Sequence, residues 1–486
     1  MPWFEPALVA QETALVAGRP FAFHDAAVLG TGLTLLVHAP DRALALAAAR
    51  AARTEIDRLD RILNWRDPGS ELSALNRSRR HHASPDLFAV LSAAERWREI
   101  TGGAFSGRIG RLAALWREAK HPPPDAAKAA QAAERATVEL DPQARAVVRP
   151  DAVLYDLDAL AKGYILDKAL AAAMDSPGVT AALLDIGGDI RCAGPHAWPV
   201  GLPEPLTPFD NAPLIGAFRL EGQAIATSGC GPRDPLVGGA RYSAVLDPRT
   251  GRPAPHRRSA TAIAPSAMDA DALATALLNL TPEEGSALVR ATPGAAARLA
   301  DPDGAAWLAG PPPAAFIPVQ APRPAAPAKA SPGRWHDRWV AFVDFTAPPR
   351  QMERDRAFRS PYVALWVSDL QNRLVRTLFL VGTTPEWQRD NYIWWGLSRA
   401  DAMEVIATRS LSTRNTGIYK VLWDGVDEKG KRVRAGRYRI NLETSRERGK
   451  HTHRFVELDF SQAKPLEAEL PMTQDAGKLE VRFGKF

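Results

Sequence analysis

The sequence predicts an α+β domain, then a proline-rich linker, then an all-β, immunoglobulin-like sandwich domain. Residues 1–310 alternate alanine-rich helical stretches with short apolar runs, as layered domains of helices and strands do. Residues 311–333 contain eight prolines, a composition typical of an extended spacer. Residues 334–486 hold 7 of the 13 tryptophans and alternate apolar with polar residues as strands do. We therefore expect domains at 1–310 and 334–486, joined by the linker 311–333.

Composition excludes several classes of protein. Of the 486 residues 46% are hydrophobic and 24% are charged, which is ordinary for globular chains. An apolar run of the ~18 residues needed for a transmembrane helix does not occur in the sequence. The first residues, MPWFEPALVAQETALVAG, lack the pattern of a secretory signal, so none is expected. Two cysteines, Cys192 and Cys230, allow one bridge but neither a disulfide framework nor a four-cysteine zinc site.

The net charge of +6 comes from the C-terminal third, where residues 334–486 carry 27 basic and 20 acidic side chains. Its densest patch, KGKRVRAGRYR at 429–439, has six cations and could attract phosphates. A solvated hairpin explains it better, because Val433, Tyr438 and Ile440 fit a half-buried strand. We expect no nucleic-acid partner.

Periodicity and capping residues place the elements of the first region. The helix at 41–63 presents an apolar stripe of Leu44, Ala48, Ala51, Ile56, Leu59 and Leu63. Other predicted elements are helices at 70–76, 83–101, 156–174 and 266–280, a hairpin at 136–151, and a strand at 181–194 that breaks at paired glycines.

Four glycine-punctuated segments end these elements: TGGAF (101–105), LDIGGDI (184–190), IATSG (225–229) and LDPRTG (246–251). Free backbone amides at such positions can receive phosphate or carbonyl oxygens, although each segment alone is also an ordinary turn. The G-x-G-x-x-G and G-x-x-x-x-G-K-[ST] fingerprints are absent from the sequence, so neither a Rossmann nor a P-loop site is predicted.

Two helices carry candidate ligands. Asp271 and Thr275 are four residues apart, so both oxygens lie on one helix face, where they could bind Mg²⁺ or simply face solvent. Lys162 follows Asp156 and Asp158, and could neutralise a phosphate or pair with a carboxylate.

These elements, in this order, resemble the ApbE-type FAD:protein FMN transferase family from about residue 29 to residue 310. The matching segments are Gly30-Thr31, DPGSELSALN (67–76), TGGAF (101–105), DLDALAKGYILDKA (156–169), DIGGDI (185–190), ATSG (226–229), LDPRTGRP (246–253) and ADALATAL (270–277).

The resemblance implies Mg²⁺-dependent transfer of FMN from FAD to a threonine hydroxyl of a target protein, with release of AMP. It implies that Asp271, Thr275 and the Ala159 carbonyl are metal ligands, and it makes Lys162 and Asp271 the candidate catalytic residues. The implied FAD contacts are Leu29 (where the family usually has Met), Ala104, Phe105, Ser106, Asp156, Lys162, Gly187, Gly188, Asp189, Thr227, Ser228, Gly229 and Val245. The implied partner is an acceptor protein with a threonine flavinylation motif, a membrane redox subunit, and the implied location is periplasmic or membrane-associated.

Three positions depart from the family pattern. Ser106 replaces the Asp of GGAFD, and Ala244 replaces a histidine before the LDP motif. Ala274 stands where some members carry another metal-binding Asp and others have Ala. The histidine is a candidate base, so its absence supports an alternative: an FAD pyrophosphatase or a non-catalytic FAD-binding scaffold. Ser243 or His256 could compensate for it.

The C-terminal region resembles an uncharacterised periplasmic-type β-sandwich family. The resemblance lies in SPYVALWVSDL (360–370), RDNYIWWGLSR (389–399) and WDGVDEKGKRVRAGRYRI (423–440). Trp423 and Tyr438 are expected in the core of that sandwich, with Gly425 in a tight turn.

Overall fold

The structure is a computed structural model, and it describes the greater part of the chain. The described residues are 20–203, 214–229, 236–237, 240–255, 258–301, 306–310, 317–318, 335–336, 339–346, 362–381, 389–398, 410–411, 418–445, 451–473 and 477–485. Cys230 and His256 lie outside them.

An eight-stranded sheet organises the first region, and every neighbouring pair of its strands is antiparallel. In spatial order its strands are β1 (Phe21–Val28), β2 (Thr31–His38), β6 (Ala181–Ile186), β7 (Asp189–Ala193), β10 (Ala224–Gly229), β15 (Ser259–Ala264), β16 (Ala296–Ala300) and β17 (Ala306–Ala309). The predicted strand at 181–194 is thus a hairpin, β6 and β7, that reverses at the two glycines.

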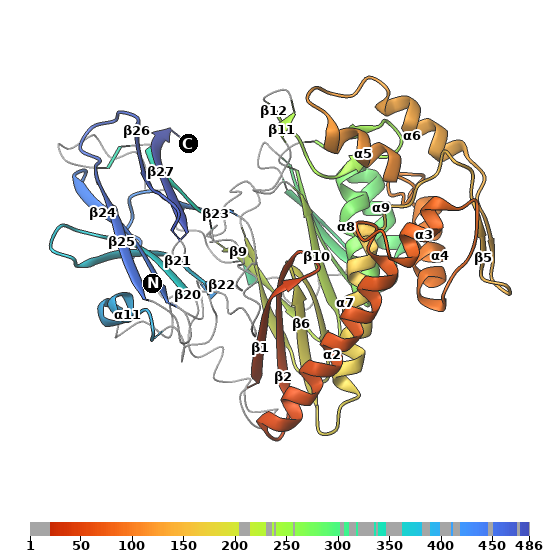
Figure 1. The fold of residues 1–486 in the computed structure, drawn as a ribbon, viewed down its shortest axis with the longest axis horizontal. Helices are drawn as coiled ribbons and strands as arrows, with labels where there is room; N and C mark the ends of the chain where they lie inside the picture. Colours follow the sequence, from red (N-terminus) through yellow and green to blue (C-terminus); the bar gives the residue numbers. More distant parts are fainter. Residues whose placement is uncertain are drawn as a thin grey trace.

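Three long helices lie side by side on one face of this sheet (Figure 1). They are α2 (Arg42–Leu63), α7 (Asp158–Met174) and α8 (Ala267–Asn279). In α2 the buried stripe is Ala45, Ala48, Ala52, Ile56, Leu59 and Leu63, so the prediction was wrong at its first and third positions. The alanine-rich first half explains the error, because neighbouring alanines do not distinguish one face of the helix from the next.

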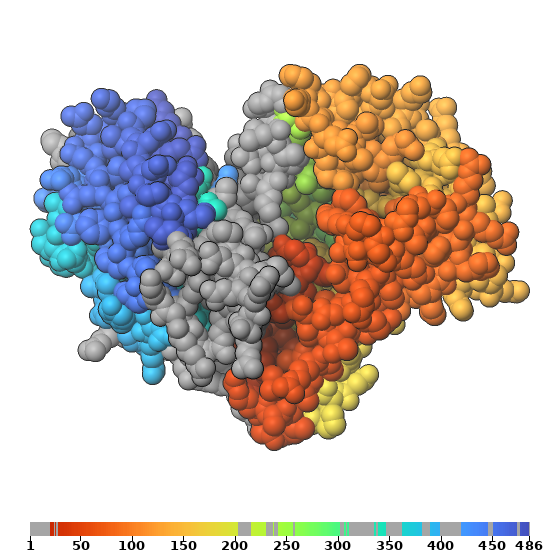
Figure 2. Space-filling view, viewed as in Figure 1, coloured from red at the N-terminus to blue at the C-terminus, as the bar shows by residue number. Residues whose placement is uncertain are grey.

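Shorter helices and a small sheet stand beside this core and form much of the red and orange surface in Figure 2. They are α3 (Glu71–Arg77), α4 (Pro85–Ile100), α5 (Gly110–Glu118), α6 (Ala126–Arg135), β3 (Arg80–His82), β4 (Glu139–Asp141) and β5 (Ala146–Val148). The predicted hairpin at 136–151 is confirmed as β4 and β5. Helix α9 (Pro282–Ala291) packs on β16 and β17.

A second apolar cluster packs between the main sheet and the strands β8 (Trp198–Pro203) and β9 (Leu214–Leu220). Cys192, a free and buried thiol, belongs to it. Within the range predicted as a linker, β18 (Ile317–Pro318) pairs with β9. Two small hairpins complete the region: β11 (Leu236–Val237) with β12 (Ala240–Arg241), and β13 (Leu246–Asp247) with β14 (Arg252–Pro253).

The C-terminal region is an all-β sandwich with its own core, as predicted. One sheet contains β23 (Ile418–Trp423), β19 (Trp339–Thr346), β27 (Lys478–Lys485) and β26 (Leu466–Leu470); the other contains β22 (Ser410–Leu411), β21 (Leu374–Val381), β20 (Tyr362–Ser368), β24 (Arg437–Ser445) and β25 (Thr452–Asp459). Trp423 and Tyr438 contact each other at 5.2 Å between ring centroids. Gly425 has a φ of +78°, and a Cβ there would overlap the Trp335 ring, so this turn requires glycine.

The short helix α11 (Tyr392–Leu397) buries Trp394 against the outer face of the second sheet. Among the helices of the described residues, none is both long enough and apolar enough to cross a membrane.

Candidate functional site

The site begins where α7 and α8 approach each other at Gly163. A Cβ at this position would overlap the Ala267 carbonyl at the start of α8, so only glycine permits the contact. Asp271 follows Ala267 by four residues on α8, and the Gly163 backbone lies close enough to its carboxylate to oppose the rise in its pKa. Gly163 in turn follows Ala159 by one helical turn of α7. The close approach of the two helices therefore places this part of α7 beside Asp271.

A group of opposite charges lies beside this contact, and in it the carboxylates are buried whereas the lysine is partly exposed. Lys162 of α7 forms an ion pair with Asp189, the first residue of β7. The backbone of Thr227 on β10 lies close enough to Asp189 to oppose the rise in its pKa. Burial raises the pKa of Asp271, and repulsion from Asp189 raises it further. Burial alone would lower the pKa of Lys162, but the carboxylates of Asp189 and Asp271 outweigh it, so the net shift is upward. Lys162 therefore stays cationic.

The residues present fit a hard divalent cation. Asp271 is 6% exposed, and its Oδ2 has no hydrogen-bond partner within the described residues, which leaves a buried acceptor that a cation would satisfy. The Thr275 Oγ1 lies one turn along α8, 3.2 Å from the Ser228 Oγ. With the Ala159 carbonyl, these donors are all oxygens, as Mg²⁺ prefers. The described residues contain no group of three or more His, Cys, Asp or Glu side chains of the kind that cages a metal. Mg²⁺ commonly binds one or two carboxylates plus phosphates and waters rather than such a cage.

Two tight turns border the charged group. The β1–β2 turn contains Leu29 and Gly30 with φ of +51° and +76°, and the β6–β7 turn contains Gly187 and Gly188 with φ of +65° and +97°. A Cβ on Gly187 would lie 2.7 Å from Thr31, so the two turns touch. A positive φ at a leucine is uncommon, and such strain gathers at functional sites.

At four glycines the structure shows the ordinary-turn alternative, because their backbone N–H groups are already bonded. The N–H groups of Gly102 and Gly103 donate to the carbonyls of Glu99 and Arg98, and that of Gly187 donates to the Gly32 carbonyl on β2. The fourth, on Gly188, donates to the Asp185 carboxylate at 2.9 Å. These four N–H groups are therefore engaged within the fold, where an incoming phosphate would need them free.

Asp156 stands immediately before α7. Burial, together with repulsion from Asp158, raises its pKa to about 7, and the Arg117 guanidinium lies 3.6 Å away.

The ligand face of α8 continues to Asn279, four residues beyond Thr275. The Asn279 side-chain amide donates to the carbonyls of Ala104 (3.0 Å) and Leu246 (3.1 Å). One helix face thus ties the TGGAF turn to the LDPRTG turn. Ala104 and Phe105 are buried there, and the Phe105 N–H donates to the Thr101 hydroxyl oxygen at 3.1 Å.

The position of the missing histidine lies on the approach to the LDPRTG turn. Ala244 is exposed. Ser243 is buried, and its Oγ accepts from the N–H of Val245 at 3.2 Å. The Ser243 hydroxyl is therefore held by its own backbone, which argues against it as a replacement base.

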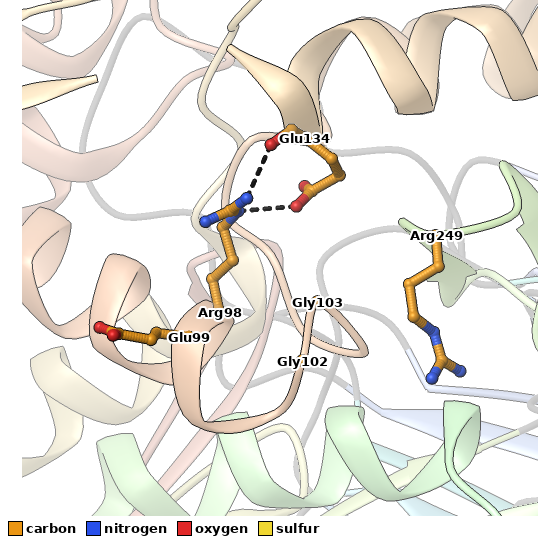
Figure 3. Close-up of a pocket in the computed structure, with 6 residues that line it drawn as sticks. All are labelled: Arg98, Glu99, Gly102, Gly103, Glu134 and Arg249. Atoms are coloured by element: carbon orange, nitrogen blue, oxygen red, sulfur yellow. Dashed lines mark hydrogen bonds and ion pairs between the residues drawn. The ribbon is translucent and has the colours of Figure 1, made fainter. Parts of the chain in front are cut away.

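A pocket of 390 Å³ opens between these turns and α6 (Figure 3). Its lining residues are Arg98, Glu99, Gly102, Gly103, Glu134 and Arg249.

The structure brings the predicted residues together in two places. The residues that meet at the charged group are Lys162, Asp189, Thr227, Ser228, Asp271 and Thr275. Those that lie by the pocket are Ala104, Phe105 and Ser106. Sequence reasoning missed Gly163, Asn279 and Glu134. Asn279 had a signal, because it continues the spacing of Asp271 and Thr275, whereas Glu134 had none.

Comparison with known proteins decides the family. Residues 29–299 match the family model described as "ApbE family". The chain belongs to the ApbE family. It is 31% identical over 277 residues to an FAD:protein FMN transferase of Klebsiella pneumoniae, an alignment that covers 55% of this chain and 85% of that protein. A transferase of the same name from Escherichia coli K12 is 30% identical, with 49% of this chain and 72% of that protein covered.

The fold agrees with this assignment. The crystal structure of the ApbE protein from Thermotoga maritima superposes with a TM-score of 0.54 at 27% identity, and covers 60% of this chain and 97% of that one. Residues 349–478 match a second family model, described as "Predicted periplasmic protein (DUF2271)". The chain therefore combines an ApbE-family domain with a domain of that second family.

Proposed function

We propose that the protein is an FAD:protein FMN transferase that requires Mg²⁺. The observation that carries the proposal is the buried Asp271 carboxylate, whose Oδ2 lacks a partner within the described residues beside the Lys162–Asp189 pair and the Thr275 hydroxyl. The kinship at about 30% identity to transferases of this name supports it.

In the proposed reaction a threonine oxygen of the acceptor bonds to the FMN phosphorus, the pyrophosphate bond breaks, AMP leaves and the threonine proton goes to a base. Asp271, Thr275 and the Ala159 carbonyl would hold Mg²⁺, which supplies charge stabilisation at the phosphate oxygens. Lys162 stays cationic beside Asp189 and so attracts the pyrophosphate.

The remaining assignments are part of the proposal. The predicted FAD contacts from Leu29 to Val245 line the FAD site. Residues 1–310 carry the activity, residues 311–333 link the two regions, and residues 334–486 serve as an accessory domain. The acceptor is a protein with a threonine flavinylation site.

A second candidate function is hydrolysis of FAD to FMN and AMP. One observation favours it: Ala244 presents an exposed methyl group where family members carry the histidine, and Ser243 is engaged by the Val245 N–H. Without a base near the acceptor hydroxyl, water could take the place of threonine.

The test incubates the protein with FAD, Mg²⁺ and a threonine-bearing acceptor peptide, and follows peptide mass and AMP together. We expect an FMN-sized gain in mass that is lost in Asp271→Asn and retained in Asp57→Asn, a matched change on the exposed surface of α2. AMP without modified peptide would replace transfer with hydrolysis, and neither product would leave the FAD-binding scaffold.

A further inference from the structure

Ser106, the residue that departs from the GGAFD pattern, contacts a carboxylate from another element. Its Oγ lies 2.6 Å from Oε1 of Glu134, at the end of α6. The same Oγ accepts from the Arg108 N–H at 3.2 Å. Because an ionised carboxylate can only accept hydrogen bonds, the Ser106 hydroxyl is the donor of this hydrogen bond to Glu134. A carboxylate therefore lies next to position 106 although residue 106 does not carry it.

Arg98 of α4 fixes the position of Glu134. Its Nε donates to Oε2 at 2.6 Å, and its Nη2 donates to the Glu134 backbone carbonyl at 2.7 Å. With the Ser106 bond, two contacts hold the carboxylate and a third holds the backbone of the same residue, so little conformational entropy remains for a ligand to remove. A carboxylate has about four acceptor positions, and Ser106 and Arg98 occupy two of them in the described part of the chain.

The carboxylate lies on the wall of the pocket in Figure 3, across the glycine turn from Arg249. A Cβ on Gly103 would lie 3.5 Å from Arg249 Cγ and 3.7 Å from Glu134 Oε2, so the glycine keeps the space between them open. The Arg249 guanidinium already donates to Asp247 and to the Asn279 carbonyl. Of the two carboxylates that line the pocket, that of Glu99 points away from the glycine turn in Figure 3, so Glu134 is the acceptor that faces it.

Helix α8 sets the distance from this pocket to the charged group. Asp271 and Asn279 are eight residues apart on one face, or roughly 12 Å at 1.5 Å per residue. Asn279 bonds to the Ala104 carbonyl, two residues before Ser106. A dinucleotide with its phosphates at Asp271 and Lys162 can therefore extend one of its rings toward Glu134.

We propose that Glu134 supplies, from α6, the carboxylate that other family members carry at position 106, and that it binds an N–H group of a heterocycle of FAD. This inference rests on the proposed function, because FAD is its ligand. The Glu134 carboxylate repels phosphate and can only accept hydrogen bonds. It therefore binds a ring N–H, which donates one, rather than the pyrophosphate. Both rings of FAD offer one: the imide of the isoalloxazine and the amino group of adenine.

The test compares Glu134→Ala, the double variant Ser106→Asp with Glu134→Ala, and Glu139→Gln, a control on the exposed edge strand β4. Binding of FAD, riboflavin and AMP to the full-length protein is measured by flavin fluorescence and calorimetry, without acceptor or turnover. We expect Glu134→Ala to weaken FAD binding about 10- to 100-fold, as for one hydrogen bond to a charged group. The double variant should recover most of the affinity, and Glu139→Gln should bind like the wild type.

Riboflavin and AMP identify the ring, because only the ligand that contacts Glu134 should lose affinity. Unchanged FAD binding in Glu134→Ala would overturn the proposal, as would a loss that Ser106→Asp does not recover. If a separate transfer assay shows that Glu134→Ala raises only the KM for the acceptor peptide, the carboxylate serves the peptide and the proposal is wrong. Wild-type protein that binds FAD but transfers nothing would refute the proposed function alone, whereas protein that does not bind FAD would refute both.

Discussion

Replacing Asp271 with asparagine separates the cost of burying a carboxylate from its use as a metal ligand. Asparagine has nearly the same volume, so packing in α8 is retained. Burial and repulsion from Asp189 penalise the ionised form of the wild-type side chain, a penalty that the neutral amide avoids, and such desolvation costs are about 1–3 kcal/mol. Without metal at pH 8, Asp271→Asn should therefore be more stable than wild type by about that amount.

Mg²⁺ should reverse this order. A cation at 100 times its dissociation constant stabilises the wild type by about 2.7 kcal/mol, and should add little to the variant, which has lost the charged ligand.

The difference in stability between the variant and the wild type should also depend on pH, with a definite sign. Because the folded pKa of Asp271 is raised, its protonated form stabilises the wild type in acid, and this stability is lost as pH rises through the folded pKa. The advantage of the variant should accordingly grow with pH and disappear in acid.

Urea unfolding followed by tryptophan fluorescence, with EDTA or MgCl₂ and at several pH values, measures both effects. The N-terminal region and the C-terminal sandwich have separate main cores, so the transition that responds to FAD identifies the N-terminal region. Asp57→Asn on the surface of α2 is the matched control. The reasoning is refuted if Asp271→Asn is destabilised without metal at pH 8, or if Mg²⁺ stabilises it as much as the wild type.

Two further predictions concern neighbouring charges. Lys162→Met leaves the buried Asp189 without its cation; because the Lys162 side chain is 31% exposed, urea unfolding should show a loss below the ~3–5 kcal/mol of a fully buried pair. Burial raises the pKa of Asp185 to about 6, so its contribution to stability is present in acid and falls by roughly 3 kcal/mol as pH rises through 6. Asp185→Asn should remove this slope from a series of unfolding measurements between pH 4 and 8.

Each of these has a clear contrary result. Lys162→Met that unfolds with the wild-type midpoint would show that Asp189 is solvated rather than buried with its partner. An unchanged pH slope in Asp185→Asn would assign the slope to another carboxylate, since the Gly188 N–H can still donate to the asparagine oxygen.

Local patterns predicted most of the fold, and failed where the chain gives no local preference. The paired glycines end β6 as expected, and the helices expected at 41–63 and 70–76 begin at the N-caps Asp41 and Ser70, whose side chains mark such ends by their own chemistry. The phase of the α2 stripe was misplaced because adjacent alanines are equivalent. Pairing of Ile317–Pro318 with β9 joins segments about 100 residues apart, which composition does not encode.

The candidate site divides in the same way. Asp271 and Thr275 follow from helical spacing, and Lys162 lies on a recognisable helix. Its partner Asp189 comes from a strand, so the ion pair required the fold. Glu134 could be predicted even less, because nothing in the alanine-rich sequence of its helix indicates that its side chain faces residue 106.

The two departures from the family motif therefore differ in kind. A carboxylate at position 106 can come from any element that reaches it, whereas a base must also have a suitable pKa and face the acceptor hydroxyl. Ala244 is exposed, so Ala244→His needs no rearrangement of the core. If the base is what this chain lacks, that variant should accelerate transfer to a peptide by about 10²–10⁴-fold, with an inflection near pH 6.5 and unchanged FAD affinity. Single-turnover transfer across pH 5–9 measures this. A rate and pH profile identical to wild type would mean that another group already removes the threonine proton.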